Sequence, residues 1–221
     1  MSQGLLTCFS SRSDKDVLES FLAPISAAGL SPIIVDVDYF ALENMFELNQ
    51  MPNAMNTVAL IDIGARYSAI NIIKDGSSVF TGDVPLGGRN FTDIVAEELG
   101  LTESQAETLK ITGKGDSRQR AEIEHALSVA SGQLFDEIQR SFSFFWTDPG
   151  DQIESIYLSG GTARIPGLDS AMSKHLQVPV EVVDPFFSVT INRHANEEFI
   201  RQHAASLAVS VGLATRRPGD Q

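Results

Sequence analysis

The sequence predicts an α/β fold in which three antiparallel strands are followed by alternating helices and parallel strands. The antiparallel strands are predicted by three apolar runs that tight turns separate: 57–63, 67–74 and 77–84. Between the last two runs lies Asp75-Gly76, which is typical of a β-hairpin. Two further apolar runs, at 153–159 and 178–183, alternate with helical patterns and predict the parallel strands.

The first fifty residues have a pattern of their own. The predicted elements are, in order, a strand at 5–10, a helix at 14–28, a buried strand at 32–37 and a helix at 39–49. This string is too short to bury a core, so we interpret 1–50 as the remnant of a larger unit. Residues 51–56 predict a linker.

Helical periodicity occupies most of the remaining chain. Five helices are predicted here. The first runs from about Thr92 to Gly100, and the second begins with a capping box at Thr102. The others cover 118–146, 167–176 and 196–214. Together with the strands, this order is typical of a ribonuclease-H-like fold. We therefore interpret 57–190 as one complete half of such a fold, and 191–221 as a helix that returns to the remnant.

The composition indicates an acidic protein with enough apolar residues for a core. The chain of 221 residues is 43% apolar and carries a formal net charge of −13. Because nucleic acids and anionic membranes are bound through clustered Lys and Arg, we expect neither as a direct partner. No apolar run approaches the ~20 residues of a bilayer span. The start has no basic region of a signal peptide, so we expect a cytoplasmic protein.

Asp62 and Gly64 end the first strand of the complete half, in Leu-Ile-Asp-Ile-Gly. Open α/β sheets bind ligands at this edge, where a carboxylate can hold a metal-bound water and glycine lets backbone N–H groups approach phosphate. The alternative is an ordinary hairpin turn. A carboxylate between apolar neighbours is costly to bury, which favours the functional interpretation.

A second glycine turn, Ser159-Gly160-Gly161, follows the strand at 153–159 and precedes Arg164. A flat base can lie against a backbone without Cβ atoms, with an arginine stacked over it. The alternative is a tight strand-to-helix turn. The Gly-x-Gly-x-x-Gly spacing does not occur at this turn, so a dinucleotide site is not expected.

Two more pairs have open interpretations. Gly87-Gly88 follows the third strand and either faces the same phosphates or only reverses the chain. Glu107 and Lys110 lie one helical turn apart. They wall a ribose–adenine pocket, or they form a surface ion pair contributing about 0.2–0.5 kcal/mol, and their spacing alone favours the surface pair.

The motifs together resemble the actin-like ATPase superfamily, and within it the PilM family of type IV pilus assembly proteins, which is FtsA-like. The matching segments are Ala28-Gly29-Leu30, Asp62-Ile-Gly64-Ala, Val84-Pro-Leu-Gly87-Gly88, Ala106-Glu107-Thr-Leu-Lys110, Leu158-Ser-Gly160-Gly161-Thr-Ala-Arg164, Pro185-Phe186 and Val211-Gly212. The resemblance covers nearly the whole chain. It implies an actin-like (ribonuclease-H-like) fold, present as one complete half plus remnants of the other.

The resemblance also implies roles for these residues. ATP and Mg²⁺ would be bound, with Asp62 as the catalytic residue that positions Mg²⁺ through water. Phosphates would lie at Gly64, Gly87 and Gly88. Glu107 and Lys110 would contact the ribose and the base. Gly160, Gly161 and Arg164 would form the surface on which the base lies.

The implied partner is the N-terminal tail of a PilN-like inner-membrane protein, which would attach the chain to the membrane peripherally along with other assembly proteins. The family's first phosphate motif, an Asp-x-Gly turn, does not occur ahead of residue 57. We therefore expect a chain that starts partway through the first half, with weakened ATP binding. Activity is expected to be weak ATPase at most. The alternatives are a sugar-kinase-type phosphotransferase, a related secretion-system component, or a ribonuclease-H-like nuclease, which the net charge disfavours.

Overall fold

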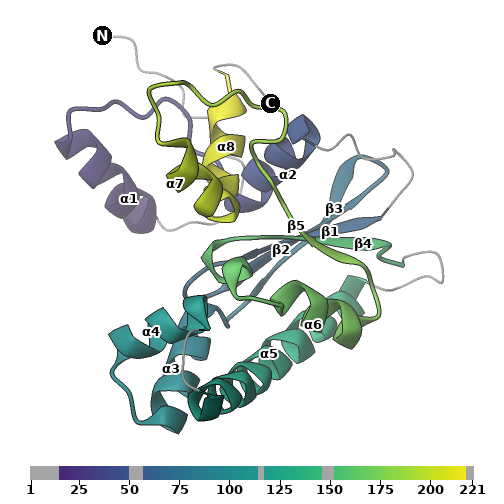
Figure 1. The fold of residues 1–221 in the computed structure, drawn as a ribbon. Helices are drawn as coiled ribbons and strands as arrows, with labels where there is room; N and C mark the ends of the chain where they lie inside the picture. The colour runs from purple at the N-terminus through teal and green to yellow at the C-terminus, as the bar shows by residue number, and fades with distance from the viewer. Residues whose placement is uncertain (1–14, 50–56, 114–116, 146–151, 218–221) are drawn as a thin grey trace.

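The computed structural model describes residues 15–49, 57–113, 117–145 and 152–217, and arranges them around one five-stranded sheet (Figure 1). The helices are α1 (Lys15–Ala27), α2 (Asp38–Asn49), α3 (Gly88–Leu99), α4 (Glu103–Thr112), α5 (Ser117–Phe145), α6 (Leu168–Leu176), α7 (Glu197–Gln202) and α8 (Ala208–Thr215). The strands are β1 (Val58–Ile63), β2 (Ser68–Lys74), β3 (Ser77–Val84), β4 (Ser155–Ser159) and β5 (Val180–Val182). Two 3-10 turns are η1 (Gly161–Arg164) and η2 (Ala204–Leu207). Within these ranges, no helix combines the length and apolar character needed to cross a membrane.

The sheet has the predicted topology, with the order β3-β2-β1-β4-β5. β1 pairs antiparallel with β2 and parallel with β4, and β5 adds parallel to β4. The β2–β3 hairpin turns at Asp75 and Gly76, which both have positive φ (53° and 75°), as a two-residue turn of this kind requires. The central position of β1 between an antiparallel and a parallel neighbour puts Asp62 opposite both Ala69 and Ser159.

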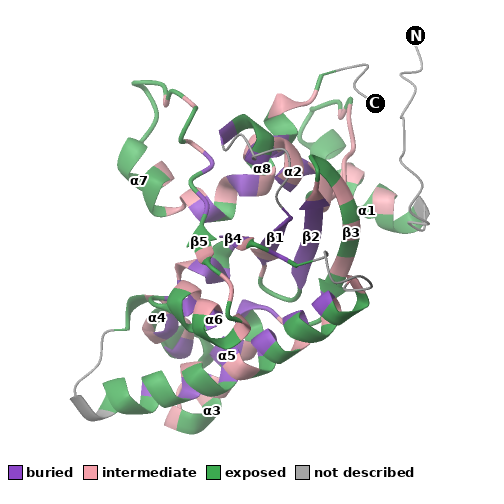
Figure 2. Ribbon diagram, turned by 90° about the vertical axis from the view of Figure 1, so that its right-hand side faces the viewer, coloured by how far each residue is buried: buried purple, intermediate pink, exposed green. Residues whose placement is uncertain are grey.

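Helices cover both faces of the sheet. Alternate residues of β1 point to opposite faces, so Ala59, Ile61 and Ile63 enter the large core under α3, α5 and α6. Val58 and Leu60 enter a smaller core with α2 and α8. The buried residues of β1 and β2 lie between these layers (Figure 2). By the same alternation, Asp62 lies on the side of the sheet that α2 and α8 cover.

The predicted strand over 32–37 is wrong, because this segment has no strand assignment and Ile33 is 69% exposed. Neither edge strand of the described sheet, β3 or β5, pairs with this segment. The segment is held by an ion pair, in which Arg216 Nε lies 2.6 Å from Asp36 Oδ2. The strand predicted over 5–10 lies outside the described residues.

The predicted final helix over 196–214 is divided in the structure. α7 begins where expected, with the Asn196 side chain accepting from the Phe199 N–H at 3.1 Å. The chain then tightens into η2, where the Ala205 carbonyl accepts a hydrogen bond from the Gly160 N–H at 2.8 Å. A carbonyl that binds another segment leaves the helical ladder, so the helix restarts as α8. The third helix also starts earlier than predicted, at Gly88.

Candidate functional site

The site begins at the carboxyl ends of β1 and β4, which are parallel neighbours. The Ser159 hydroxyl donates a hydrogen bond of 2.8 Å to Asp62 Oδ1, across 97 residues of sequence. Burial raises the pKa of the Asp62 carboxyl; the bond from Ser159 offsets part of this shift, and the charge of Asp38 adds to it. Asp62 is thus a largely desolvated acid at the ligand-binding edge of the sheet.

Three turns meet beside this pair and are joined through their backbones. The Gly64 carbonyl accepts hydrogen bonds from the Gly88 N–H (2.8 Å) and from the Thr162 hydroxyl (3.0 Å). The Arg89 N–H donates to the Ala65 carbonyl at 2.8 Å. The turns after β1, β3 and β4 therefore form one hydrogen-bonded unit.

Gly87 and Gly160 hold this unit together by close packing. A Cβ at Gly87 would lie 2.7 Å from the Gly64 carbonyl oxygen and 2.8 Å from the Ala65 carbonyl carbon. A Cβ at Gly160, which has φ of +89°, would overlap the Ile63 backbone. Only glycine fits at either position without displacement of the neighbouring strand end.

Glu107 and Lys110 do not form the surface ion pair that their spacing favours. Lys110 is buried, with 4% of its surface exposed, and its ammonium lies 2.6 Å from Glu107 Oε2. The same ammonium donates to the Gly88 carbonyl (3.0 Å) and to the Thr92 hydroxyl (2.9 Å). Three donors thus have three acceptors, and α4 is fastened to the first turn of α3.

Glu107 is the half of this pair that reaches solvent, since 46% of its side chain is exposed. Burial by itself raises the pKa of Glu107, but the hydrogen bonds from Lys110 and Thr92, together with the Lys110 charge, outweigh it. The net effect lowers the pKa, so Glu107 is a carboxylate at neutral pH.

These turns and helices enclose a pocket of about 400 Å³, within the range of small-ligand sites. Its lining residues are Gly64, Ala65, Arg66, Gly88, Arg89, Thr92, Glu103, Glu107, Lys110, Ile111, Gly161, Thr162 and Arg164. Six of the candidates from the sequence are among them: Gly64, Gly88, Glu107, Lys110, Gly161 and Arg164. The other three lie behind or beside the wall: Asp62 next to Ser159, and Gly87 and Gly160 against the neighbouring backbone.

Several lining residues were not identified from the sequence. Arg66 shares the turn of Asp62 and Gly64, so its position two residues after Gly64 was a usable signal. Thr92 lies four residues after Gly88 and its hydroxyl oxygen is 3.0 Å from the Gly88 carbonyl oxygen, a proximity that helical spacing could have indicated. Nothing in the sequence pattern pointed to Arg89, whose Nη2 lies 3.9 Å from Glu103 Oε1.

The pocket is cationic in a chain whose formal net charge is −13. Four cationic side chains and two carboxylates line it. Among the described residues, Arg66 and Arg164 have no ion-pair partner, and the pair between Arg89 and Glu103 is exposed and weak. Unpaired arginines beside glycine turns are the groups that bind phosphate oxygens.

Comparisons with known proteins agree with this architecture. Residues 5–218 match the family model of the type IV pilus assembly protein PilM. Among solved structures, the PilM-PilN type IV pilus biogenesis complex has a TM-score of 0.76 and 26% identity, covering 91% of this chain and 58% of that one. This chain therefore spans less than two thirds of that protein.

Two more distant structures share the fold. The ethanolamine utilization protein EutJ from Carboxydothermus hydrogenoformans has a TM-score of 0.68 and 19% identity, over 92% of this chain and 62% of that one. MreB5 of Spiroplasma citri bound to AMPPNP has a TM-score of 0.62 and 14% identity, over 92% and 65%. The fold is thus the actin-like α/β fold that the sequence predicts. Because the family model matches nearly the whole length of this chain, the chain belongs to the PilM family of type IV pilus assembly proteins.

Proposed function

We propose that the chain is a nucleotide-regulated scaffold of type IV pilus assembly, which binds ATP in the pocket between the glycine turns and α4. The observation that carries this proposal is the convergence of four separate segments on one cationic pocket of about 400 Å³. The base would lie on Gly161 under Arg164, with Gly160 forming the turn behind it, and the phosphates would lie at the Gly64 and Gly88 turns.

Glu107 and Lys110 have different parts in this proposal. The exposed carboxylate of Glu107 is an acceptor for ribose hydroxyl groups. Lys110 has its three donors already engaged within the chain, so it acts by holding Glu107 and the Gly88 carbonyl in place. A ligand at Glu107 would thereby be connected to the turn that holds the phosphates.

A magnesium ion would enter this site with the phosphates. Among the described residues, no cluster of three or more His, Cys, Asp or Glu side chains is arranged to hold a metal. Mg²⁺ binds through one or two carboxylates together with substrate phosphates and water, which suits the single acid Asp62. Asp62 fits an indirect role, in which it orients a water molecule of the ion and accepts from Ser159 on its other side.

As a scaffold, the chain would hold the N-terminal tail of a PilN-like inner-membrane protein, and would thereby sit on the cytoplasmic side of that membrane. The similarity to a protein solved as a PilM-PilN complex supports this partner. Nucleotide binding can control such a contact only if the partner binds the nucleotide-bound and nucleotide-free states with different affinity.

Isothermal titration calorimetry with Mg²⁺ and ATP, ADP or adenosine tests the site. Arg164→Ala should weaken ATP binding at least tenfold, because it removes the side chain that would stack over the base. Arg140→Ala is the matched control, since Arg140 pairs with Glu137 on the exposed face of α5, and it should leave binding unchanged. Equal loss in both variants contradicts the proposed base site, and equal affinity for ATP and adenosine contradicts the proposed phosphate contacts.

The scaffold role has a separate test. The affinity of the chain for a synthetic PilN-like cytoplasmic tail is measured with and without ATP, in the wild type and in Asp62→Ala. We expect the nucleotide to change the affinity in the wild type alone. An affinity indifferent to both nucleotide and Asp62 would refute the coupling, while leaving nucleotide binding intact.

A further inference from the structure

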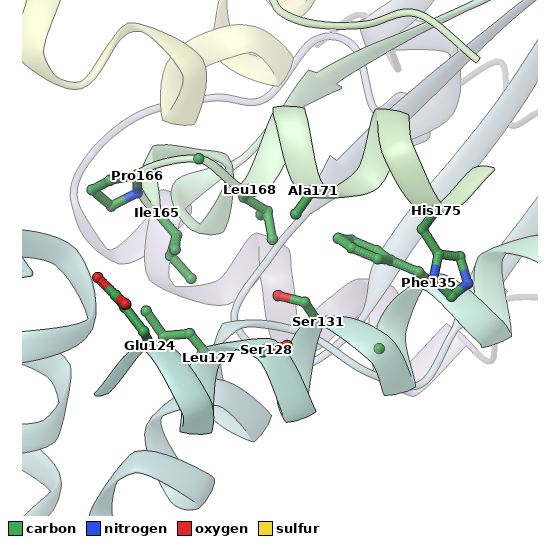
Figure 3. A pocket seen from close by; sticks show the side chains of 12 residues that line it. Glu124, Leu127, Ser128, Ser131, Phe135, Ile165, Pro166, Leu168, Ala171 and His175 are labelled. Carbon is green, nitrogen blue, oxygen red and sulfur yellow. The ribbon is translucent and has the colours of Figure 1, made fainter. Parts of the chain in front are cut away.

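A second cavity, which shares no lining residue with the proposed nucleotide pocket, lies in the groove between α5 and α6 (Figure 3). It measures about 380 Å³ and its lining residues are Glu124, Leu127, Ser128, Ser131, Gly132, Phe135, Ile165, Pro166, Gly167, Leu168, Ala171 and His175. One wall is α5, and the other is the turn after η1 with the first turns of α6. The proposed function uses none of these residues.

Gly132 in the α5 wall is not required by the packing of the described residues. It lies in the middle of a 29-residue helix, where glycine costs about 1 kcal/mol relative to alanine. A Cβ added at Gly132 would meet no described atom within 4 Å. The space beside Gly132 is therefore part of the groove, and no side chain of a described residue fills it.

Ser131 supplies a polar group to this groove. It is 7% exposed, and its side chain rises from α5 toward the space between the two walls (Figure 3). Within the described residues its hydroxyl has no hydrogen-bond partner, and the oxygen is open to the groove rather than sealed in the core. A ligand that supplies a donor or an acceptor at this point would satisfy the group.

The shape and charge of the groove decide the chemistry of the ligand. Its α5 wall runs from Glu124 to Phe135, a rise of about 16 Å along a helix and about the length of five extended residues. The middle is apolar, with Leu127, Ile165 and Leu168 as its larger side chains. Glu124, at one end, is an exposed carboxylate without an ion-pair partner among the described residues.

We propose that this groove binds a short extended peptide of a partner protein. The peptide inserts one aliphatic or aromatic side chain beside Ser131 and Gly132, and a backbone group bonds to the Ser131 hydroxyl. A Lys or Arg of the peptide lies opposite Glu124. The strong negative charge of the chain favours the approach of a basic peptide.

The test selects phage-displayed random 12-residue peptides on the wild-type chain, with counter-selection on Gly132→Trp, which fills the groove. The best peptide is then synthesised and its affinity measured by fluorescence anisotropy. We expect an apolar anchor flanked by Lys or Arg. Gly132→Trp should weaken binding at least tenfold, and Glu124→Lys should weaken it severalfold, with the effect decreasing at high salt.

Two further variants keep the result interpretable. Gln133→Trp adds the same side chain on the exposed face of α5 and should leave the affinity within twofold. Ser128→Trp blocks the groove from an exposed position if Gly132→Trp does not fold. Failure to recover peptides that depend on the groove overturns the proposal, as does selection of acidic peptides. A dimer of this chain that Gly132→Trp dissociates would assign the groove to self-association and would also overturn it.

Discussion

The glycine turns at the proposed nucleotide pocket and the α5–α6 groove use glycine for opposite reasons. At Gly87, a Cβ would lie 2.7 Å from the Gly64 carbonyl oxygen, and at Gly160 it would overlap the Ile63 backbone. At Gly132 it would meet no atom of the described residues within 4 Å. The turns therefore need glycine so that the chain can pack on itself. In the groove, the missing side chain leaves space for another molecule.

The largest expected effect concerns Gly160. Gly160→Ala should lower the free energy of unfolding by about 3 kcal/mol, because it combines a positive φ with overlap of the β1 end. Gly161→Ala is the matched control, since its Cβ would lie 3.7 Å from Ser206 Oγ, an ordinary contact. Urea denaturation measures both. Equal stability of the two variants would show that the turns are not packed as described.

The next effect concerns the buried cation of the pocket wall. Lys110→Met should cost about 2 kcal/mol of stability, because it leaves the Thr92 hydroxyl and the Gly88 carbonyl short of a partner. This is below the ~3–5 kcal/mol of a fully buried pair, since the Glu107 side chain is 46% exposed. Lys174→Met on the exposed face of α6 is the control and should cost almost nothing.

The pH dependence of the same pair has a definite sign. The pKa of Glu107 is lowered in the folded chain, so its contribution to stability is present at neutral pH and is lost as the pH falls through that pKa. The difference in unfolding free energy between wild type and Lys110→Met should therefore shrink in acid. A difference that stays constant down to the acid transition would contradict this account of Glu107.

A smaller effect of opposite sign is expected in the groove. Gly132→Ala should raise stability by about 0.5–1 kcal/mol, because alanine favours the helix and its methyl group has room. Gly100→Ala is the comparison, because Gly100 also has no neighbour within 4 Å but has φ of +64° at the end of α3, so that alanine should destabilise. Loss of stability in Gly132→Ala would mean that the groove is already filled.

The smallest effect is expected at Asp62. The pKa of Asp62 is raised in the folded chain, so the wild-type protein loses stability as the pH rises through that pKa and Asp62 ionises. The Asp62→Asn variant has no such loss. The variant should melt a few degrees higher at neutral pH and at the same temperature as the wild type in acid. Asp93→Asn, exposed on α3, is the control for the change of net charge. A variant that melts lower at every pH would contradict a desolvated Asp62.

Local patterns predicted much of this structure, and long-range contacts account for the rest. The apolar runs and the Asp75-Gly76 turn predicted the antiparallel strands, because both patterns involve residues that are close together in the sequence. The spacing of Glu107 and Lys110 is the same on a surface and in a wall, so it could not reveal that Gly88 and Thr92 bury the ammonium. The break before α8 depends on Gly160, which is more than forty residues away.

The most direct test of the account is hydrogen–deuterium exchange with and without Mg²⁺ and ATP. If the glycine turns and α4 form one site, protection should appear together in residues 62–67, 87–92, 103–111 and 160–164. In the α5 wall of the groove, residues 124–135, the exchange rates should be the same with and without Mg²⁺ and ATP. Protection confined to one of the four segments, or found in the α5 wall instead, would contradict a single nucleotide site built from all of them.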